Sequence, residues 1–186
     1  MFGKKEKILV HHYKVESISQ LIAHSAQEQG YCGYWGFLKF ILKNIWSFYL
    51  NLLAMVMPFS NLRVVLHRAR GVKIGKDVMI GFNVTIDLFY PQYITIEDGV
   101  AIAGHNLIIA HSRPPEYHKN HFESYIAPVS IRKNAWITVG VTVLAGVIIG
   151  EGSVISAGSI VQNDIPPYSI AAGNPAKVVH QFKKEG

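Results

Sequence analysis

Isoleucine and valine recur every six residues through the last two thirds of the chain. The twelve positions form three runs: Ile74, Ile80 and Ile86; Ile96, Ile102 and Ile108; and Ile131, Ile137, Val143, Ile149, Ile155 and Val161. The third residue after nearly every one of them is Gly, Asn, Asp or His, the types that best tolerate a positive φ. A single β-strand alternates with period two and cannot give this pattern. Short strands joined by regular corners can, and three hexads then close one triangular coil.

Stacked coils of this kind pair as parallel strands and hold their β-branched residues inside. The pattern therefore predicts a mainly β fold, a parallel β-helix, over residues 71–166, followed by a C-terminal tail over residues 167–186. Because the centre of such a coil is filled, any ligand must bind on its outside or between protomers.

The six-residue spacing breaks twice. Ten residues separate Ile86 from Ile96, and 23 separate Ile108 from Ile131. The longer gap predicts a loop extruded from the β-helix over residues 112–128. Long loops on a rigid repeat often carry function.

Residues 1–70 lack the repeat and are predicted to be helical. Residues 35–59 are strongly apolar, but Lys39 and Lys43 lie one turn apart on one helix face, which indicates an amphipathic helix. The uncharged part, residues 45–59, is shorter than the roughly 20 apolar residues that span a membrane. Two main interpretations stay open: the helix packs within its domain or oligomer, or it lies on a membrane surface. A true membrane span is the third and least favoured interpretation.

Composition narrows the classes of partner. Lys and Arg outnumber Asp and Glu by 18 to 12, which favours an anionic partner, but no RNA-binding or DNA-reading signature accompanies them, so no nucleic acid is expected. Cys32 is the one cysteine of the chain, which excludes an internal disulfide and a cysteine zinc cluster. The apolar run near the N-terminus is too short for a signal peptide, so we expect a cytoplasmic protein, with a peripheral place at the inner face of the membrane as the alternative.

The repeat also resembles a known family. The resemblance covers roughly residues 71–180 and is carried by GVKIGKDVMIGFNVTID, ITIEDGVAIAGHNLIIAHSRPP and NAWITVGVTVLAGVIIGEGSVISAGSIVQNDIPPYSIAAGNPAKVV. These segments resemble the hexapeptide-repeat sugar and polysaccharide O-acetyltransferases, such as the galactoside, maltose and nodulation acetyltransferases. The resemblance implies a left-handed β-helix, a homotrimer, and transfer of an acetyl group from acetyl-CoA to a hydroxyl of a sugar or polysaccharide acceptor, with no metal.

In that family the histidine that opens the long loop is the general base, and His111 holds this position. A neutral imidazole, with a pKa of about 6.5, can take the proton of a hydroxyl that attacks a thioester. The alternative is that His111, like His105, simply fills a corner that tolerates positive φ.

Further site residues follow from the same resemblance. Asn83 and Asp87 match positions that line the acceptor pocket, and Asp87 could also orient the histidine. The backbone N–H near Val139 matches the donor to the oxyanion. The residues expected along coenzyme A are Trp136, Val139, Gly140, Ala157, Gly158, Asn163 and Lys177. The chain departs from the family at Thr138, where Gly is common, and at Asn163, where a lysine is frequent.

Three competing functions remain. An N-acetyltransferase of an amino sugar or xenobiotic would use the same base. A non-catalytic β-helix that serves as an assembly module would bind no acyl-CoA. A carbonic anhydrase on the same fold would need metal-binding histidines two coils apart, and no histidine lies between His67 and His105.

Overall fold

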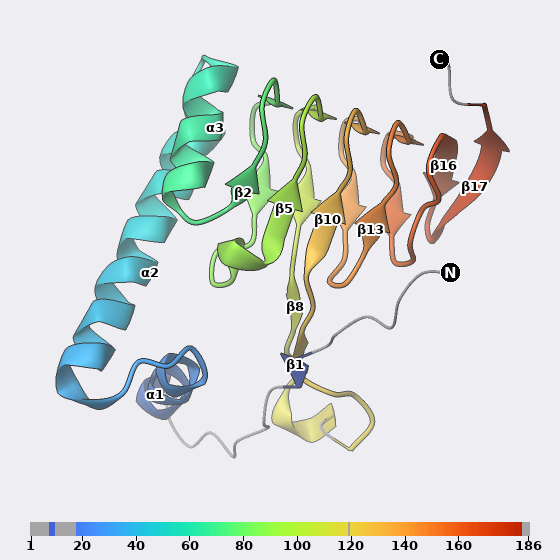
Figure 1. Cartoon of the computed structure of the whole chain (residues 1–186). Helices are drawn as coiled ribbons and strands as arrows, with labels where there is room; N and C mark the ends of the chain where they lie inside the picture. The colour runs from blue at the N-terminus through green and yellow to red at the C-terminus, as the bar shows by residue number, and fades with distance from the viewer. Residues whose placement is uncertain (1–7, 10–17, 119, 184–186) are drawn as a thin grey trace.

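The computed structural model describes residues 8–9, 18–118 and 120–183. Residues 1–7 and 10–17 of the expected helical region, residue 119 of the expected loop and residues 184–186 of the expected tail lie outside the described residues. The described chain forms a stack of triangular coils with two of its three helices against the N-terminal end, and the first helix lies beside the far end of the second (Figure 1).

Three parallel sheets make the sides of the coils. The first face consists of β2 (Lys73–Ile74), β5 (Ile94–Ile96), β10 (Val129–Ile131) and β13 (Ile148–Ile149). The second consists of β3 (Met79–Ile80), β6 (Ala101–Ile102), β11 (Trp136–Ile137) and β14 (Val154–Ile155). The third consists of β4 (Thr85–Ile86), β7 (Leu107–Ile108), β12 (Thr142–Val143) and β15 (Ile160–Val161).

The residues with the six-residue spacing end these strands and stack on one another. On the second face, Ile80 pairs with Ile102, Ile102 with Ile137, and Ile137 with Ile155, and all four are fully buried. The predicted inward column of β-branched side chains is therefore present and forms the hydrophobic core.

Corners with positive φ join the strands. Asn83 and His105 have φ of 53° and 61°, and Gly140 and Gly158 have φ of 71° and 70°. His111 differs from His105, because it lies in the extended strand β8 (His111–Ser112). The alternative that His111 merely fills a left-handed corner is therefore wrong, while His105 does fill one.

Both breaks in the spacing are structured. The shorter holds a 3-10 turn at Pro91–Tyr93. In the longer, β8 pairs antiparallel with β9 (Tyr125–Ile126), a second 3-10 turn lies at Glu116–His118, and β1 (Ile8–Leu9) pairs with β9 from the other side. The segment expected as a loop thus begins and ends as a two-stranded ribbon that projects from the coils (Figure 1). Ile8–Leu9 was expected to be helical, but it is a strand because the open edge of β9 offers backbone hydrogen bonds.

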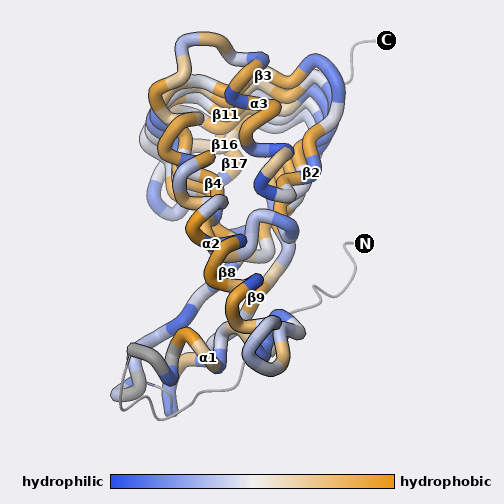
Figure 2. The backbone as a smooth tube through the Cα atoms, turned by 90° about the vertical axis from the view of Figure 1, so that its left-hand side faces the viewer, coloured by the Kyte–Doolittle hydropathy of each residue, from blue (hydrophilic) through white to orange (hydrophobic). Residues whose placement is uncertain are grey.

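The three helices are α1 (Ile18–Glu28), α2 (Gly33–Val56) and α3 (Ser60–Ala69). Helix α3 packs on β3 and α2 and covers the open end of the first coil, which Figure 2 shows from that side. The Nε of Arg63 on α3 donates to the carbonyl of Ile80, 2.6 Å away. The helices therefore close the N-terminal end of the stack.

At the other end, the segment expected as a tail forms a hairpin. Strand β16 (Ser169–Gly173) continues the second face beside β14, and β17 (Ala176–Gln181) pairs antiparallel with β16. Ala171 and Ala176 join the core. The hairpin forms because the β-branched and small residues of this segment extend the sheet over the last coil.

Helix α2 is apolar on its outer side as well. Its buried residues include Phe40 and Leu50, yet many large side chains face outward: Tyr34, Trp35, Leu42, Trp46, Phe48, Tyr49, Leu52 and Val56. None of the described helices has the length and apolar character needed to cross a membrane. The two interpretations of residues 35–59, packing in an oligomer or lying on a membrane surface, stay predictions.

Candidate active site

His111 and Asp87 form a hydrogen-bonded pair at one corner of the β-helix. Strands β4 and β7 pair in register on adjacent coils, so Asp87 and His111, which follow them, leave the third face side by side. The Nδ1 of His111 lies 2.6 Å from the Oδ2 of Asp87. One full coil of the β-helix thus brings together two residues that are 24 positions apart in sequence.

Both oxygens of the Asp87 carboxylate are hydrogen-bonded, and the side chain is wholly buried. Its Oδ1 accepts from the backbone N–H groups of Phe89 and Tyr90, each at 3.0 Å, and its Oδ2 also accepts from Ala110 at 2.8 Å. Burial alone raises the pKa of Asp87, but the hydrogen bond and charge of His111 and these backbone donors bring that pKa below its usual value. Asp87 is therefore ionised at neutral pH.

An ionised Asp87 fixes the state of the histidine. Because the carboxylate accepts only, the Nδ1 of His111 must carry a proton, which leaves its Nε2 as an acceptor when the ring is neutral. Asp87 therefore serves as the orienting group. Its side chain is wholly buried in this chain, and its expected place in the lining of the acceptor pocket stays a prediction.

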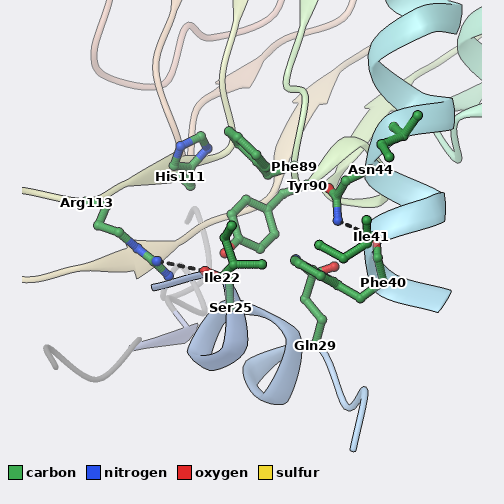
Figure 3. A pocket seen from close by; sticks show the side chains of 11 residues that line it. Ile22, Ser25, Gln29, Phe40, Ile41, Asn44, Phe89, Tyr90, His111 and Arg113 are labelled. Carbon is green, nitrogen blue, oxygen red and sulfur yellow. Dashed lines mark hydrogen bonds between the residues drawn. The ribbon is translucent and has the colours of Figure 1, made fainter. Parts of the chain in front are cut away.

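A cavity of about 360 Å³ lies beside the imidazole, between α1, α2 and the ribbon. Figure 3 shows these side chains, which are Ile22, Ser25, Gln29, Phe40, Ile41, Asn44, Ile45, Phe89, Tyr90, His111 and Arg113. The ring centroids of Phe89 and Tyr90 lie 6.1 and 5.2 Å from the ring centroid of His111. The histidine thus faces an apolar chamber built largely by the helical region.

A buried arginine links that helical region to the backbone of Asp87. Arg70 donates to the carbonyls of Ile86 and Asp87 at 2.9 and 2.7 Å. It also contacts helix side chains, namely Ser47 and Asn51 of α2 and His67 of α3. Burial lowers the pKa of Arg70 to about 10, with Asp87 acting in the opposite direction, so Arg70 stays charged at neutral pH.

His67 completes this buried network. Burial and the charges of Arg70 and Arg63 lower its pKa to about 3, so its ring is neutral and can accept from Arg70 at Nδ1. The network could not be predicted from the sequence, because a helix pattern does not show which arginine points into the first coil.

Asn83 lies apart from the Asp87–His111 pair. It is exposed at the corner between the second and third faces, where its Nδ2 lies 2.9 Å from the Nδ1 of His105. It is not part of the cavity lining. The family resemblance assigned Asn83 and Asp87 to one acceptor pocket, but within one chain the intervening strand β4 places the two residues at opposite ends of one side of the triangle.

Several residues expected at the cofactor stack along that same corner. Gly140 donates its N–H to Gly104 of the coil below, and Gly158 donates to Val139. We call Val139, Gly140, Ala157 and Gly158 the glycine corner; all four are exposed. His111 leaves from the next corner, between the third and first faces, so within one chain a whole face separates His111 from the glycine corner.

The other expected cofactor residues are spread further. Trp136 is exposed on β11 of the second face, and Lys177 is exposed on β17. Asn163 is exposed after β15, at the corner between the third and first faces, two coils beyond the coil that the ribbon leaves. The hydroxyl of Thr138 donates to the carbonyl of Ile155 at 2.6 Å. In the described part of the chain, no group of three or more His, Cys, Asp or Glu residues could hold a metal ion.

Comparisons with known proteins agree with this architecture. Residues 71–104 and 128–163 match the family described as the hexapeptide repeat of succinyl-transferase. The chain is 40% identical over 113 residues to the galactoside O-acetyltransferase of Escherichia coli K12. That match covers 60% of this chain and 54% of the relative, so the chain spans about half the length of this curated relative.

Two solved structures extend the comparison. A hexapeptide-repeat acetyltransferase of Vibrio cholerae, complexed with acetyl coenzyme A, is 25% identical with a TM-score of 0.64, over 77% of this chain and 88% of that one. A maltose O-acetyltransferase of Clostridium difficile is 26% identical with a TM-score of 0.62, over 78% and 89%.

These findings confirm the predicted fold class, a mainly β, left-handed parallel β-helix of hexapeptide repeats with an N-terminal helical region. They also confirm the predicted resemblance to the hexapeptide-repeat acetyltransferases. Within that class, the chain is similar to proteins named galactoside and maltose O-acetyltransferases.

Proposed function

We propose that this protein transfers an acetyl group from acetyl-CoA to a hydroxyl of a sugar or polysaccharide, with His111 as general base. The observation that carries the proposal is the pairing of His111 with a buried, ionised Asp87 beside a cavity. A histidine held by a carboxylate at Nδ1 has its basic Nε2 positioned for proton transfer.

The proposed step needs no covalent intermediate on the enzyme. The Nε2 of His111 takes the proton of the acceptor hydroxyl as its oxygen bonds to the thioester carbonyl carbon. When the carbon–sulfur bond breaks, the imidazolium gives that proton to the departing thiolate. Asp87 stabilises the imidazolium between the two transfers, and the backbone N–H of Val139 is the proposed donor to the oxyanion.

We propose a homotrimer whose sites are shared between protomers. Within one chain a whole face separates His111 from the glycine corner, so a site that uses both takes the base from one protomer and the corner from its neighbour. The glycine corner fits an extended ligand, because a Cβ added at Gly158 meets nothing within 4 Å. Asn83 lies on this corner, where it would come close to the neighbouring protomer's general base and would contact the acceptor substrate. Residues proposed along coenzyme A are Trp136, Val139, Gly140, Ala157, Gly158, Asn163 and Lys177.

The test is thiol release from acetyl-CoA against a panel of sugars and amino sugars. Removal of a general base lowers turnover by about 10² or more, so we expect this loss for His111→Ala. The matched control is His121→Ala, an exposed histidine of the same excursion, which should keep the native rate. Turnover that survives His111→Ala would refute the assignment. Turnover with amino sugars alone would favour N-acetylation, and failure of the native chain to bind acyl-CoA would favour an assembly module.

A further inference from the structure

The cavity beside His111 is more apolar than recognition of a sugar requires. Its walls are mainly Ile22, Phe40, Ile41, Ile45 and Phe89. A bare sugar presents hydroxyl groups on every side, and burying these against apolar walls without partners is unfavourable. The chamber therefore matches a different chemical group.

Three polar residues of the lining, Ser25, Gln29 and Arg113, are already engaged with the protein. Arg113 donates to Ser25 at 3.0 Å and forms an ion pair with Glu28 at 2.7 Å. Gln29 accepts from Lys43 at 3.1 Å and hydrogen-bonds Tyr90. Their main contribution is to hold α1 and the ribbon in place, so they offer little to a polar ligand.

The cavity opens toward the apolar outer surface of α2. Ile45 lines the chamber and is also 49% exposed, and Trp46 next to it is 61% exposed. A group longer than the chamber can therefore continue along apolar surface. Figure 3 shows that Phe89 and His111 lie on one side of the chamber and α2 on the other.

We propose that this cavity binds an apolar aryl or alkyl group carried by the acceptor, so that the preferred substrate is an amphiphile whose sugar hydroxyl meets His111. The inference rests on the proposed acetyl transfer. The acceptor is favoured over the donor as the source of this group, because the walls belong to the same chain as the base, while the proposed donor residues line the separate glycine corner.

The test compares methyl, butyl and octyl glycosides of one reactive sugar, each below its micelle-forming concentration, with kcat/KM measured by thiol release. A buried methylene improves binding about fourfold, so three partly buried methylenes should raise kcat/KM of the butyl over the methyl glycoside by about tenfold or more. A further large gain for octyl indicates a lipid-like chain that follows α2, whereas no further gain indicates a short aglycone.

Variants of α2 locate the effect. Ile41→Trp fills the chamber and should reduce the butyl preference, measured as the ratio of kcat/KM for the butyl and methyl glycosides, to less than about twofold. The matched control is Leu42→Trp, since Leu42 is the next residue of the same helix, is 57% exposed and lies outside the chamber. It should keep the preference. If Ile41→Trp does not fold, Ile41→Ala widens the chamber and should raise the octyl-to-butyl ratio.

Three results would overturn the inference: equal kcat/KM for the methyl and butyl glycosides in the native protein, a butyl preference unchanged in Ile41→Trp, or a preference for butyryl-CoA over acetyl-CoA that Ile41→Trp removes. If no glycoside is acetylated, the proposed function fails. Calorimetric titration of the butyl glycoside into native protein and Ile41→Trp then tests the cavity by itself, with tighter binding to the native protein expected.

Discussion

Replacing Asp87 by asparagine probes how the base is held in its active state. The change keeps the shape of the side chain but replaces one acceptor oxygen by a donor. In the native protein both oxygens accept: Oδ1 from two backbone N–H groups and Oδ2 from Ala110 and His111. Whichever way the amide turns, its NH₂ group faces donors.

The less costly orientation keeps the amide oxygen on Phe89 and Tyr90 and turns the NH₂ group toward His111. The imidazole must then accept at Nδ1 and carry its proton on Nε2, which is the wrong tautomer for a base. General-base catalysis contributes about 10² to 10⁴ in rate, so we expect kcat to fall by at least about 10² while the KM for acetyl-CoA changes little. The Ala110 N–H also loses its acceptor, which costs about 1–3 kcal/mol of folding free energy.

The assay is thiol release with acetyl-CoA and the best acceptor of the panel, together with thermal unfolding of each variant. Asp98→Asn is the matched control, because Asp98 accepts from the backbone N–H of Lys76 at another corner of the coil but is half exposed and contacts no histidine. It should keep kcat within about twofold. A folded Asp87→Asn protein with native kcat would refute both the tautomer argument and the role of His111.

Three further predictions follow from the described contacts. Arg70→Met leaves the carbonyls of Ile86 and Asp87 and the amide oxygen of Asn51 without their buried donor, so urea unfolding should show that the free energy of unfolding falls by about 3 kcal/mol or more. Arg68→Met, at an exposed arginine, should lower it by about 1 kcal/mol, and equal losses would contradict the role of the buried network. The folded pKa of Asp87 is lowered, so its ionised form stabilises the protein above the unfolded value of about 3.9, and this contribution disappears as pH falls through the lower folded pKa. Urea titrations at pH 5 and pH 3 should therefore show a larger loss of unfolding free energy for the native protein than for Asp87→Asn, and parallel losses would refute it. For shared sites, random mixed trimers of the inactive variants His111→Ala and Ala157→Trp should regain about a quarter of native activity, because one interface in four joins an intact base to an intact corner; activity that stays at the level of the separate variants would place both residues in one chain's own site.

The sequence allowed the β-helix to be predicted in detail because the repeat is local. A six-residue period of β-branched residues, with left-handed types such as Asn83 and Gly140 at a fixed phase, determines strand, corner and inward direction within each hexad. The same regularity indicated where the ribbon begins, since the spacing fails directly after Ile108. The hairpin at residues 169–181 was less visible, because it extends the second face without keeping the period.

The arrangement of the candidate site residues was only partly predictable from the sequence. His111 and Asp87 were both candidates from the sequence. The spacing of residues could not show that the Asp87 carboxylate is buried, or that it accepts from three backbone N–H groups of two separate segments. The placement of Asn83 beside His105 follows from coil register. The cavity and the Arg70 network arise where α1 and α2 dock against the first coils, and docking of helices on a repeat leaves no periodic trace in the sequence.

The division of the cavity between two kinds of structure separates two properties of the protein. The carboxylate of Asp87 belongs to the coils, whose core residues are constrained by the coil above and the coil below, and the imidazole of His111 belongs to β8, which starts three residues after the coil strand β7. Most of the chamber's opposite wall belongs to α1 and α2, which no hexad constrains. A substitution such as one at Ile22 or Ile41 can therefore reshape the chamber while every strand of the stack stays in register. Under the proposed function, the range of acceptors can therefore diversify through α1 and α2 while the hydrogen bond between His111 and Asp87 is kept.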